Sequence, residues 1–150
     1  MCGIAGILSP VSPPKFDVME SLVTMAKQMP YRGPDFTGYF RFRIGGLSHN
    51  RLSIIDLSSD ANQPMISQDQ RYVISYNGEI YNYREIRRQL EHKYNFRSAS
   101  DTEVVLNSFI EWGPECLSHF NGMFAFAIMD KDKNELFAAR DRMGIKPFYY

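Results

Sequence analysis

Three segments of the chain place apolar residues three or four positions apart, which is the spacing of an amphipathic helix. The first of them has Asp17 at its start, where a carboxylate can accept hydrogen bonds from free backbone amides. The other two begin at Asn82 and Ser100, each followed three residues later by a glutamate, which is the pattern of a capping box. The spacing therefore predicts helices over 17–29, 82–90 and 100–112.

Other segments have the apolar runs or the alternation that are typical of strands. The run 2–8 is expected to form a buried strand, followed by a proline-rich loop over 9–14. A strand is also predicted over 72–76, ending in a tight turn, because Asn77 followed by Gly78 is a strong turn signal. Further strands are predicted over 36–43, 123–129 and 135–139, the last two paired across a polar turn. Strands in pairs with helices between them indicate antiparallel sheets and the α+β class.

The composition is that of one globular domain with a sizeable core. The chain has 150 residues, of which 44% are hydrophobic and 23% are charged. Lys+Arg and Asp+Glu both number 17, and this zero net charge argues against a surface for nucleic acid or an anionic membrane. No stretch approaches the roughly 20 apolar residues of a membrane span, and the apolar start lacks the basic lead of a signal peptide.

The two cysteines, Cys2 and Cys116, are expected to have different roles. Two cysteines do not make a disulfide framework, so a cytoplasmic location is expected. Neither the cysteines nor the three scattered histidines have the spacing of a metal site. Cys116 is expected to be a buried structural thiol. Cys2 would become the first residue if Met1 were removed, and it would then carry a thiol and an α-amine, with ordinary pKa values of about 8.5 and 7.7–8.0. A nucleophile beside a base is the basic unit of nucleophilic catalysis, but many chains begin Met-Cys without catalytic meaning.

Eight motifs bear on that choice: MCGIAGI at 1, YRGPDFTG at 31, HNRLSIIDLS at 49, QPM at 63, YNGEIYN at 76, SDTEVVL at 100, GMFAFAIMD at 122 and RDRMGIKPFYY at 140. In this order they resemble the glutaminase domain of class II glutamine amidotransferases, in the branch that includes the asparagine synthetases. The resemblance spans the whole chain. It implies the N-terminal-nucleophile (Ntn) hydrolase fold, a four-layer αββα sandwich of two antiparallel sheets. It also implies hydrolysis of the side-chain amide of L-glutamine to glutamate and ammonia through a thioester.

The same resemblance implies three catalytic residues. Cys2 would be the nucleophile, with its own α-amine as the base. The side-chain amide of Asn77 and the backbone N–H of Gly78 would form the oxyanion hole. Taken without the family, the pair Asn77-Gly78 is more simply explained as a hairpin turn.

A second set of residues is implied to bind glutamine. Arg51 would hold the α-carboxylate, because a guanidinium offers two parallel donors, while Asp101 and Glu79 would pair with the α-ammonium. The pocket would further be lined by Leu52, Ser53, Ile54 and Ile55. The residues alone leave simpler interpretations open, since Arg51 could be a surface arginine and Asp101 a helix-start residue.

The resemblance also implies what surrounds the domain. Residues 1–150 would be the glutaminase domain, without a metal or cofactor of its own. ATP and magnesium would belong to a synthetase domain C-terminal to it and absent from this chain. The chain ends on the apolar residues 148–150, and this end looks like that of an excised domain. Asp141 and Lys146 are expected to support the interface with that partner domain.

Several alternatives remain open at this stage. A non-catalytic amidotransferase-like scaffold or regulatory domain is disfavoured by the presence of the full set of implied site residues. A redox or metal-binding thiol protein is disfavoured by the cysteine spacing. The acceptor of the ammonia could be aspartate, a sugar or a peptide-like molecule, and the oligomeric state is not predicted.

Overall fold

Each helix and strand predicted above forms, in the predicted order, in a computed structural model that describes residues 1–9 and 11–150. The strands over 45–51 and 65–66 and the helix over 116–119 were not predicted. Pro10, in the loop predicted over 9–14, lies outside the described residues. The strands are β1 (Gly3–Leu8), β2 (Phe36–Phe42), β3 (Gly45–Arg51), β4 (Met65–Ile66), β5 (Tyr72–Ile80), β6 (Gly122–Asp130) and β7 (Glu135–Arg140). The α-helices are α1 (Val18–Lys27), α2 (Tyr83–Leu90), α3 (Asp101–Trp112) and α4 (Cys116–His119), and short 3₁₀ turns span Pro30–Arg32, Ser59–Ala61 and Gly113–Glu115.

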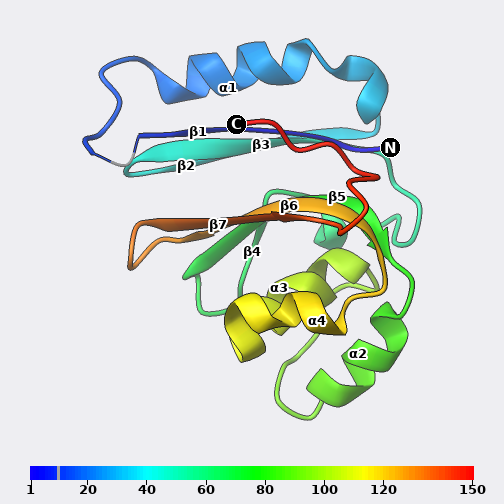
Figure 1. Cartoon of the computed structure of the whole chain (residues 1–150). Coiled ribbons are helices and arrows are strands. Elements are labelled where there is room, and N and C mark those ends of the chain that lie inside the picture. Colours follow the sequence, from blue (N-terminus) through cyan, green and yellow to red (C-terminus); the bar gives the residue numbers. More distant parts are fainter. Residues whose placement is uncertain (10) are drawn as a thin grey trace.

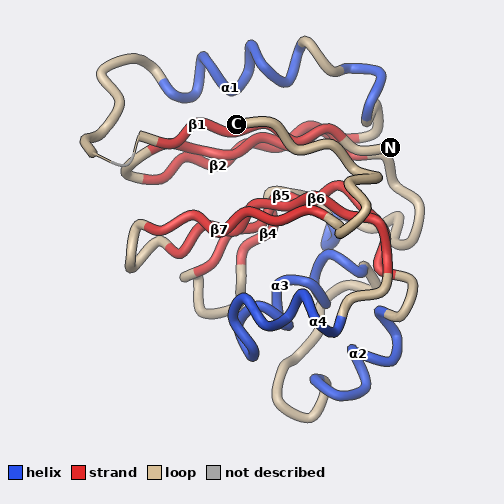
Figure 2. Tube along the Cα trace, viewed as in Figure 1, coloured by secondary structure: helices blue, strands red, loops and turns tan. Residues whose placement is uncertain are grey.

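These elements stack in four layers (Figures 1 and 2). The strands form a three-stranded sheet in the order β1-β3-β2 and a four-stranded sheet in the order β4-β5-β6-β7. Every pairing is antiparallel. Helix α1 covers the outer face of the first sheet, and α2, α3 and α4 cover the outer face of the second. The α+β class and the αββα sandwich expected from the resemblance are therefore confirmed.

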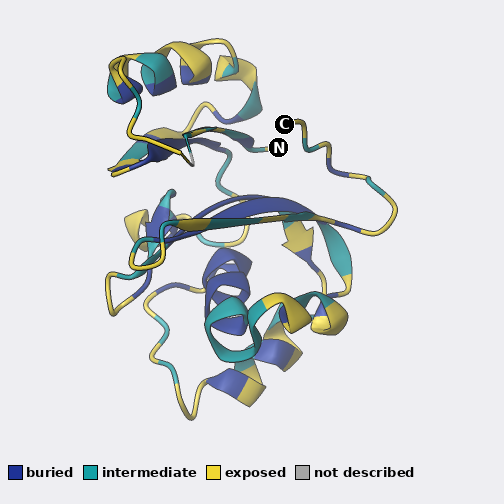
Figure 3. Cartoon of the chain, turned by 60° about the vertical axis from the view of Figure 1, so that its left-hand side comes forward, coloured by how far each residue is buried: buried dark blue, intermediate teal, exposed yellow. Residues whose placement is uncertain are grey.

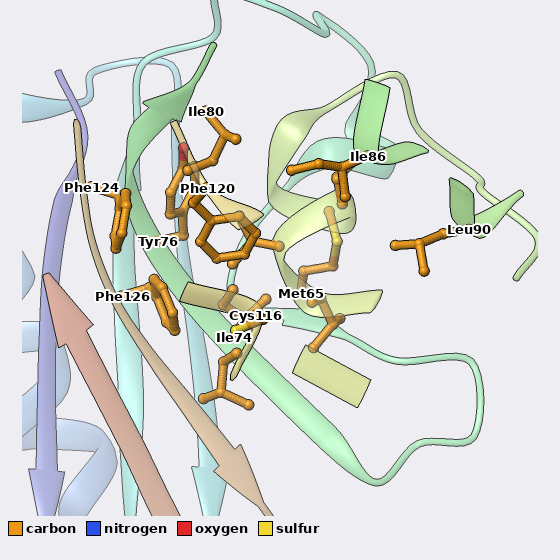
Figure 4. Close-up of a cluster of buried hydrophobic side chains, with 14 residues drawn as sticks. Met65, Ile74, Tyr76, Ile80, Ile86, Leu90, Cys116, Phe120, Phe124 and Phe126 are labelled. Atoms are coloured by element: carbon orange, nitrogen blue, oxygen red, sulfur yellow. The ribbon is translucent and has the colours of Figure 1, made fainter. Parts of the chain in front are cut away.

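Two apolar cores hold the layers together, and both involve the central strands β5 and β6. The smaller core lies between the sheets and includes Leu47, Val73 and Met129. The larger one lies between the four-stranded sheet and its helices, with Phe126, Ile80 and Leu106 fully enclosed (Figure 4). Figure 3 shows β5 and β6 buried over most of their length. Burial on both faces fixes the register of these strands, because a slip by one residue would turn every side chain over.

The helix starts confirm the caps predicted at Asp17 and Ser100, but the capping box predicted at Ser100 does not form, because the Glu103 carboxylate accepts from the N–H groups of Arg97 and Ser98 instead. Asp17 accepts from the N–H groups of Met19 and Glu20, and Ser100 accepts from that of Thr102, as helix caps do. The cap predicted at Asn82 is wrong, because its side chain instead bonds the backbone of the segment before β6, at His119 and Asn121.

Two predictions about strands are also wrong. The segment 2–8 does form a strand, but β1 lies at the edge of its sheet and only Gly3 within it is buried. The turn predicted at Asn77-Gly78 does not form, because β5 continues through both residues to Ile80 and pairs with β6 along its whole length. Side-chain packing in the larger core outweighs the local turn preference of the dipeptide.

Candidate active site

A cavity of about 110 Å³ opens where the end of β3, the end of β5 and the start of α3 meet the N-terminus. Residues implied by the resemblance lie together on its wall, namely Cys2, Arg51, Leu52, Ile54, Ile55, Asn77, Gly78, Glu79 and Asp101. Ser53 is the exception, since it does not line the cavity and its backbone N–H donates to the Asp35 carboxylate at 2.7 Å. Segments that are far apart in the sequence thus form one small polar site.

Cys2 is held at the edge of this cavity by backbone contacts. Its Sγ accepts from the Leu52 N–H at 3.4 Å and lies 3.8 Å from the Leu52 carbonyl oxygen. Its own carbonyl oxygen accepts from Arg32 Nε at 3.3 Å. Burial raises the pKa of the Cys2 thiol, although the Leu52 N–H, the positive N-terminus and Arg51 act in the opposite direction. A thiol with a raised pKa is mostly protonated near neutral pH and needs a base before it can attack.

Asn77 and Gly78 line the same cavity as Cys2. Within the described residues the Asn77 side-chain amide forms no hydrogen bond, and it lies on the walls of the cavity although Asn77 is only 5% exposed. Gly78 is required by packing, because a Cβ there would lie 2.5 Å from the Met123 carbonyl oxygen on β6. The close approach of β6 to β5 therefore fixes the position of this backbone segment.

Arg51 is buried and organises the loop that follows β3. Its Nη1 donates to the Ser58 carbonyl oxygen at 2.8 Å and to Asn62 Oδ1 at 2.7 Å, and its Nη2 donates to the Asp56 carbonyl oxygen. Three of the five guanidinium N–H donors are thus engaged within the described residues. The two remaining donors, on Nε and Nη2, are enough for a bidentate bond to a carboxylate.

Asp101 is oriented by two donors from β5. Its Oδ2 accepts from the Tyr76 hydroxyl at 2.7 Å and from the Ile80 N–H at 3.0 Å, and the residue is only 4% exposed. Burial raises the pKa of this carboxyl, while the two donors lower it again. Glu79 lies on the same wall and is exposed, so the cavity is lined by the acidic residues Asp56, Glu79 and Asp101 and by the basic residues Arg51 and Lys146.

The structure adds residues that sequence reasoning did not assign to the site. Gln63 accepts from the Tyr76 N–H at 2.7 Å and donates to Thr102 Oγ1 at 3.1 Å, which ties β5 to the start of α3. Lys146, expected at a domain interface, is buried and lines the cavity next to Met1. Gln63 and Lys146 lie inside two of the motifs that resemble the family, so the motifs could have pointed to them. The spacing of neither residue indicates a functional role by itself.

The described residues contain no group of three or more His, Cys, Asp or Glu side chains that could hold a metal ion. Among them there is also no helix that is long and apolar enough to cross a membrane.

Comparison with known proteins places this site in context. The family model described as a glutamine amidotransferase domain matches residues 1–150. Asparagine synthetase (glutamine-hydrolyzing) 1 of Bacillus subtilis is 43% identical over 152 residues, which cover 100% of the chain and 24% of that protein. Asparagine synthetase B (glutamine-hydrolyzing) of Escherichia coli is 37% identical over 149 residues, with 99% and 26% covered. The chain spans about a quarter of the length of these relatives.

A solved structure supports the same assignment. The glutamine phosphoribosylpyrophosphate amidotransferase of B. subtilis, complexed with ADP and GMP, superposes with a TM-score of 0.58 at 26% identity. The match covers 70% of the chain and 25% of that structure.

Proposed function

The chain belongs to the glutamine amidotransferase domain family, and on that premise we propose that it hydrolyses the side-chain amide of L-glutamine through the thiol of Cys2. The observation that carries the proposal is the convergence of one thiol, one unpaired side-chain amide and opposite charges on one cavity wall. Such a wall suits a small zwitterion with an amide at its far end. The position of the thiol at the N-terminus supplies the base that its raised pKa demands.

The first half of the reaction forms a thioester. With Met1 removed, the α-amine of Cys2 accepts the thiol proton while Sγ attacks the amide carbon of glutamine. The negative charge that develops on the amide oxygen is stabilised by the Asn77 side-chain amide and the Gly78 N–H. The amine then passes its proton to the nitrogen, the C–N bond breaks and ammonia leaves.

The second half releases glutamate. Water attacks the thioester carbon and gives a proton to the α-amine, the C–S bond breaks, and the proton returns to sulfur. Because the amine serves both halves, the reaction needs no histidine or carboxylate as a base. A chain that keeps Met1 has an amide nitrogen in place of this amine and cannot perform either proton transfer.

Recognition of glutamine follows from the charges on the wall. The two free N–H donors of Arg51 would bind the α-carboxylate, and Asp101 with Glu79 would bind the α-ammonium. Leu52, Ile54 and Ile55 would border the substrate between these ends, while Ser53 would hold the loop through its backbone bond to Asp35. The two charged ends discriminate an amino acid from a simple amide, because each buried charge needs its partner.

The ammonia would serve a further reaction. The relatives named above extend well beyond this stretch of sequence and carry the name asparagine synthetase. We therefore propose that the domain supplies ammonia to a C-terminal, ATP- and magnesium-dependent synthetase domain, with aspartate as the acceptor. The glutaminase domain itself would use no metal or cofactor.

Glutamate formation from glutamine tests this function. We expect the processed chain to produce glutamate and the Cys2→Ala variant to produce none. Cys116→Ala is the matched control, because it removes the other thiol, which is buried in the larger core away from the cavity. If the processed, folded wild-type chain released no glutamate, the domain would be a non-catalytic scaffold.

A further inference from the structure

Lys146 places a buried positive charge in the cavity, with no anionic partner among residues 1–9 and 11–150. The residue is only 4% exposed, and its Nζ donates to the Met1 Sδ at 2.8 Å. A thioether is a weak acceptor, and no carboxylate lies within ion-pair distance of Lys146 among the described residues. A buried ammonium is costly unless it is paired, so its presence here calls for an explanation.

The position of Lys146 is fixed by the chain around it. The Asp141 carboxylate accepts from the N–H groups of Ile145 and Lys146 at 2.8 and 2.9 Å, and from that of Phe124 on β6 at 3.1 Å. Gly144 has a positive φ of 65°, which lets the chain turn tightly at this point. The ammonium is therefore held at one place by a turn that is anchored on the central sheet.

Removal of Met1 changes what this charge faces. The Met1 Sδ and the Cys2 nitrogen are separated by five covalent bonds, so Lys146 Nζ lies within roughly 9 Å of that nitrogen. After processing, the nitrogen becomes the free α-amine and Lys146 loses its sulfur acceptor. We propose that Lys146 is a positioning residue for the reaction, whose charge disfavours the protonated form of the Cys2 α-amine and keeps that amine available as the base. This inference rests on the function proposed above.

The amine is surrounded by other charged and titratable groups, which have to be separated from the effect of Lys146. The charged and titratable side chains come from the 3₁₀ turn with Arg32, β3 with Arg51, the loop after β3 with Asp56, β5 with Tyr76 and Glu79, and α3 with Asp101. The Cys2 thiol is part of the same residue. All of these stay in place when only Lys146 is changed, so a comparison of variants at that one position isolates its charge.

The sign and size of the effect follow from Coulomb's law. A like charge raises the energy of the ammonium form, so its loss should raise the pKa of the α-amine. At roughly 9 Å and an effective dielectric constant of about 20–80, removal of the charge should raise that pKa by about 0.3–1.4 units. The acidic limb of the pH dependence of kcat/KM for glutamine should move to higher pH by the same amount, because the free amine is the active form.

The test is a direct titration of the amine in the chain with Met1 removed. The protein is labelled with ¹³C-cysteine, so that only Cys2 and Cys116 give signals, and the Cys2 Cα shift is followed against pH. Wild type is compared with Lys146→Met, which keeps the apolar stem, and with Lys146→Arg, which keeps the charge. Lys133→Met is the matched control, because it removes one exposed positive charge in the turn between β6 and β7.

We expect Lys146→Met to raise the midpoint of the amine, and Lys146→Arg and Lys133→Met to leave it at the wild-type value. An unchanged or lowered midpoint in a folded Lys146→Met chain, checked by circular dichroism, would overturn the inference. Lys146→Gln is measured in the same way if the methionine variant does not fold. A raised midpoint in a chain that releases no glutamate would support the effect of Lys146 on the amine but reject the glutaminase function, whereas an unchanged midpoint in an active chain would reject only the role of Lys146.

Discussion

His49 makes the stability of this domain depend on pH in a way that one substitution should remove. Its side chain is 0% exposed on β3, and its Nε2 lies 3.0 Å from the Tyr76 carbonyl oxygen on β5. Burial lowers the pKa of His49 from 6.5 to about 4. The ring is therefore neutral near pH 7, so Nε2 carries the proton that is donated to Tyr76 and joins the two sheets.

The direction of the pH dependence follows from proton binding. Between pH 6.5 and about 4 the unfolded chain binds a proton at His49 that the folded chain does not bind. Acid therefore favours the unfolded state across this window, and the free energy of unfolding should fall as pH falls. The shift from 6.5 to about 4 corresponds to a loss of about 3 kcal/mol between pH 8 and pH 4.

Urea unfolding at pH 8 and pH 4 measures this loss. His49→Gln keeps a neutral donor for Tyr76 but cannot titrate, so it should lose about 3 kcal/mol less than wild type over the same interval. The comparison cancels the carboxyl groups that also titrate there. His92→Gln changes an exposed histidine and should follow the wild-type curve. Equal losses in wild type and His49→Gln would refute the reasoning.

Two further substitutions probe the geometry of the cavity. Gly78→Ala should destabilise the fold by about 1–3 kcal/mol in urea unfolding, because the added Cβ would lie 2.7 Å from Phe124 Cα on β6. An unchanged midpoint would contradict the tight packing of β5 against β6 at this position. Tyr76→Phe removes the hydroxyl that orients Asp101 and should raise KM for glutamine about tenfold or more, with a smaller change in kcat; an unchanged KM would contradict the role given to Asp101.

Local signals in the sequence were reliable where a side chain acts on its own backbone. Asp17 and Ser100 cap their helices as predicted, because a cap needs only residues within one turn. The turn predicted at Asn77-Gly78 was wrong for the opposite reason. Its turn preference is local, but β5 is paired with β6 on one side and packed on both faces, and these non-local contacts decide its conformation.

In the candidate site, too, some residues could be predicted from the sequence and others depend on non-local contacts. Nine of the residues that the resemblance implies for the site lie on the cavity wall, and periodicity alone would have found none of them. The place of Lys146 on the cavity wall could not be predicted from the sequence, because it depends on a turn held by Asp141 and on proximity to the N-terminus, which is 145 positions away in sequence. The edge position of β1 is likewise set by sheet order, which an apolar run of six or seven residues does not encode.

The central claim is that Cys2 is catalytic only as the first residue, and one preparation can test it. The chain is produced with a removable N-terminal tag whose cleavage leaves Cys2 at the terminus, and glutamate formation is measured before and after cleavage with intact mass on both samples. The account predicts no glutamate from the tagged chain and steady glutamate release once the α-amine of Cys2 is free. Equal rates from the two samples would contradict it, because the thiol would then work without its own amine.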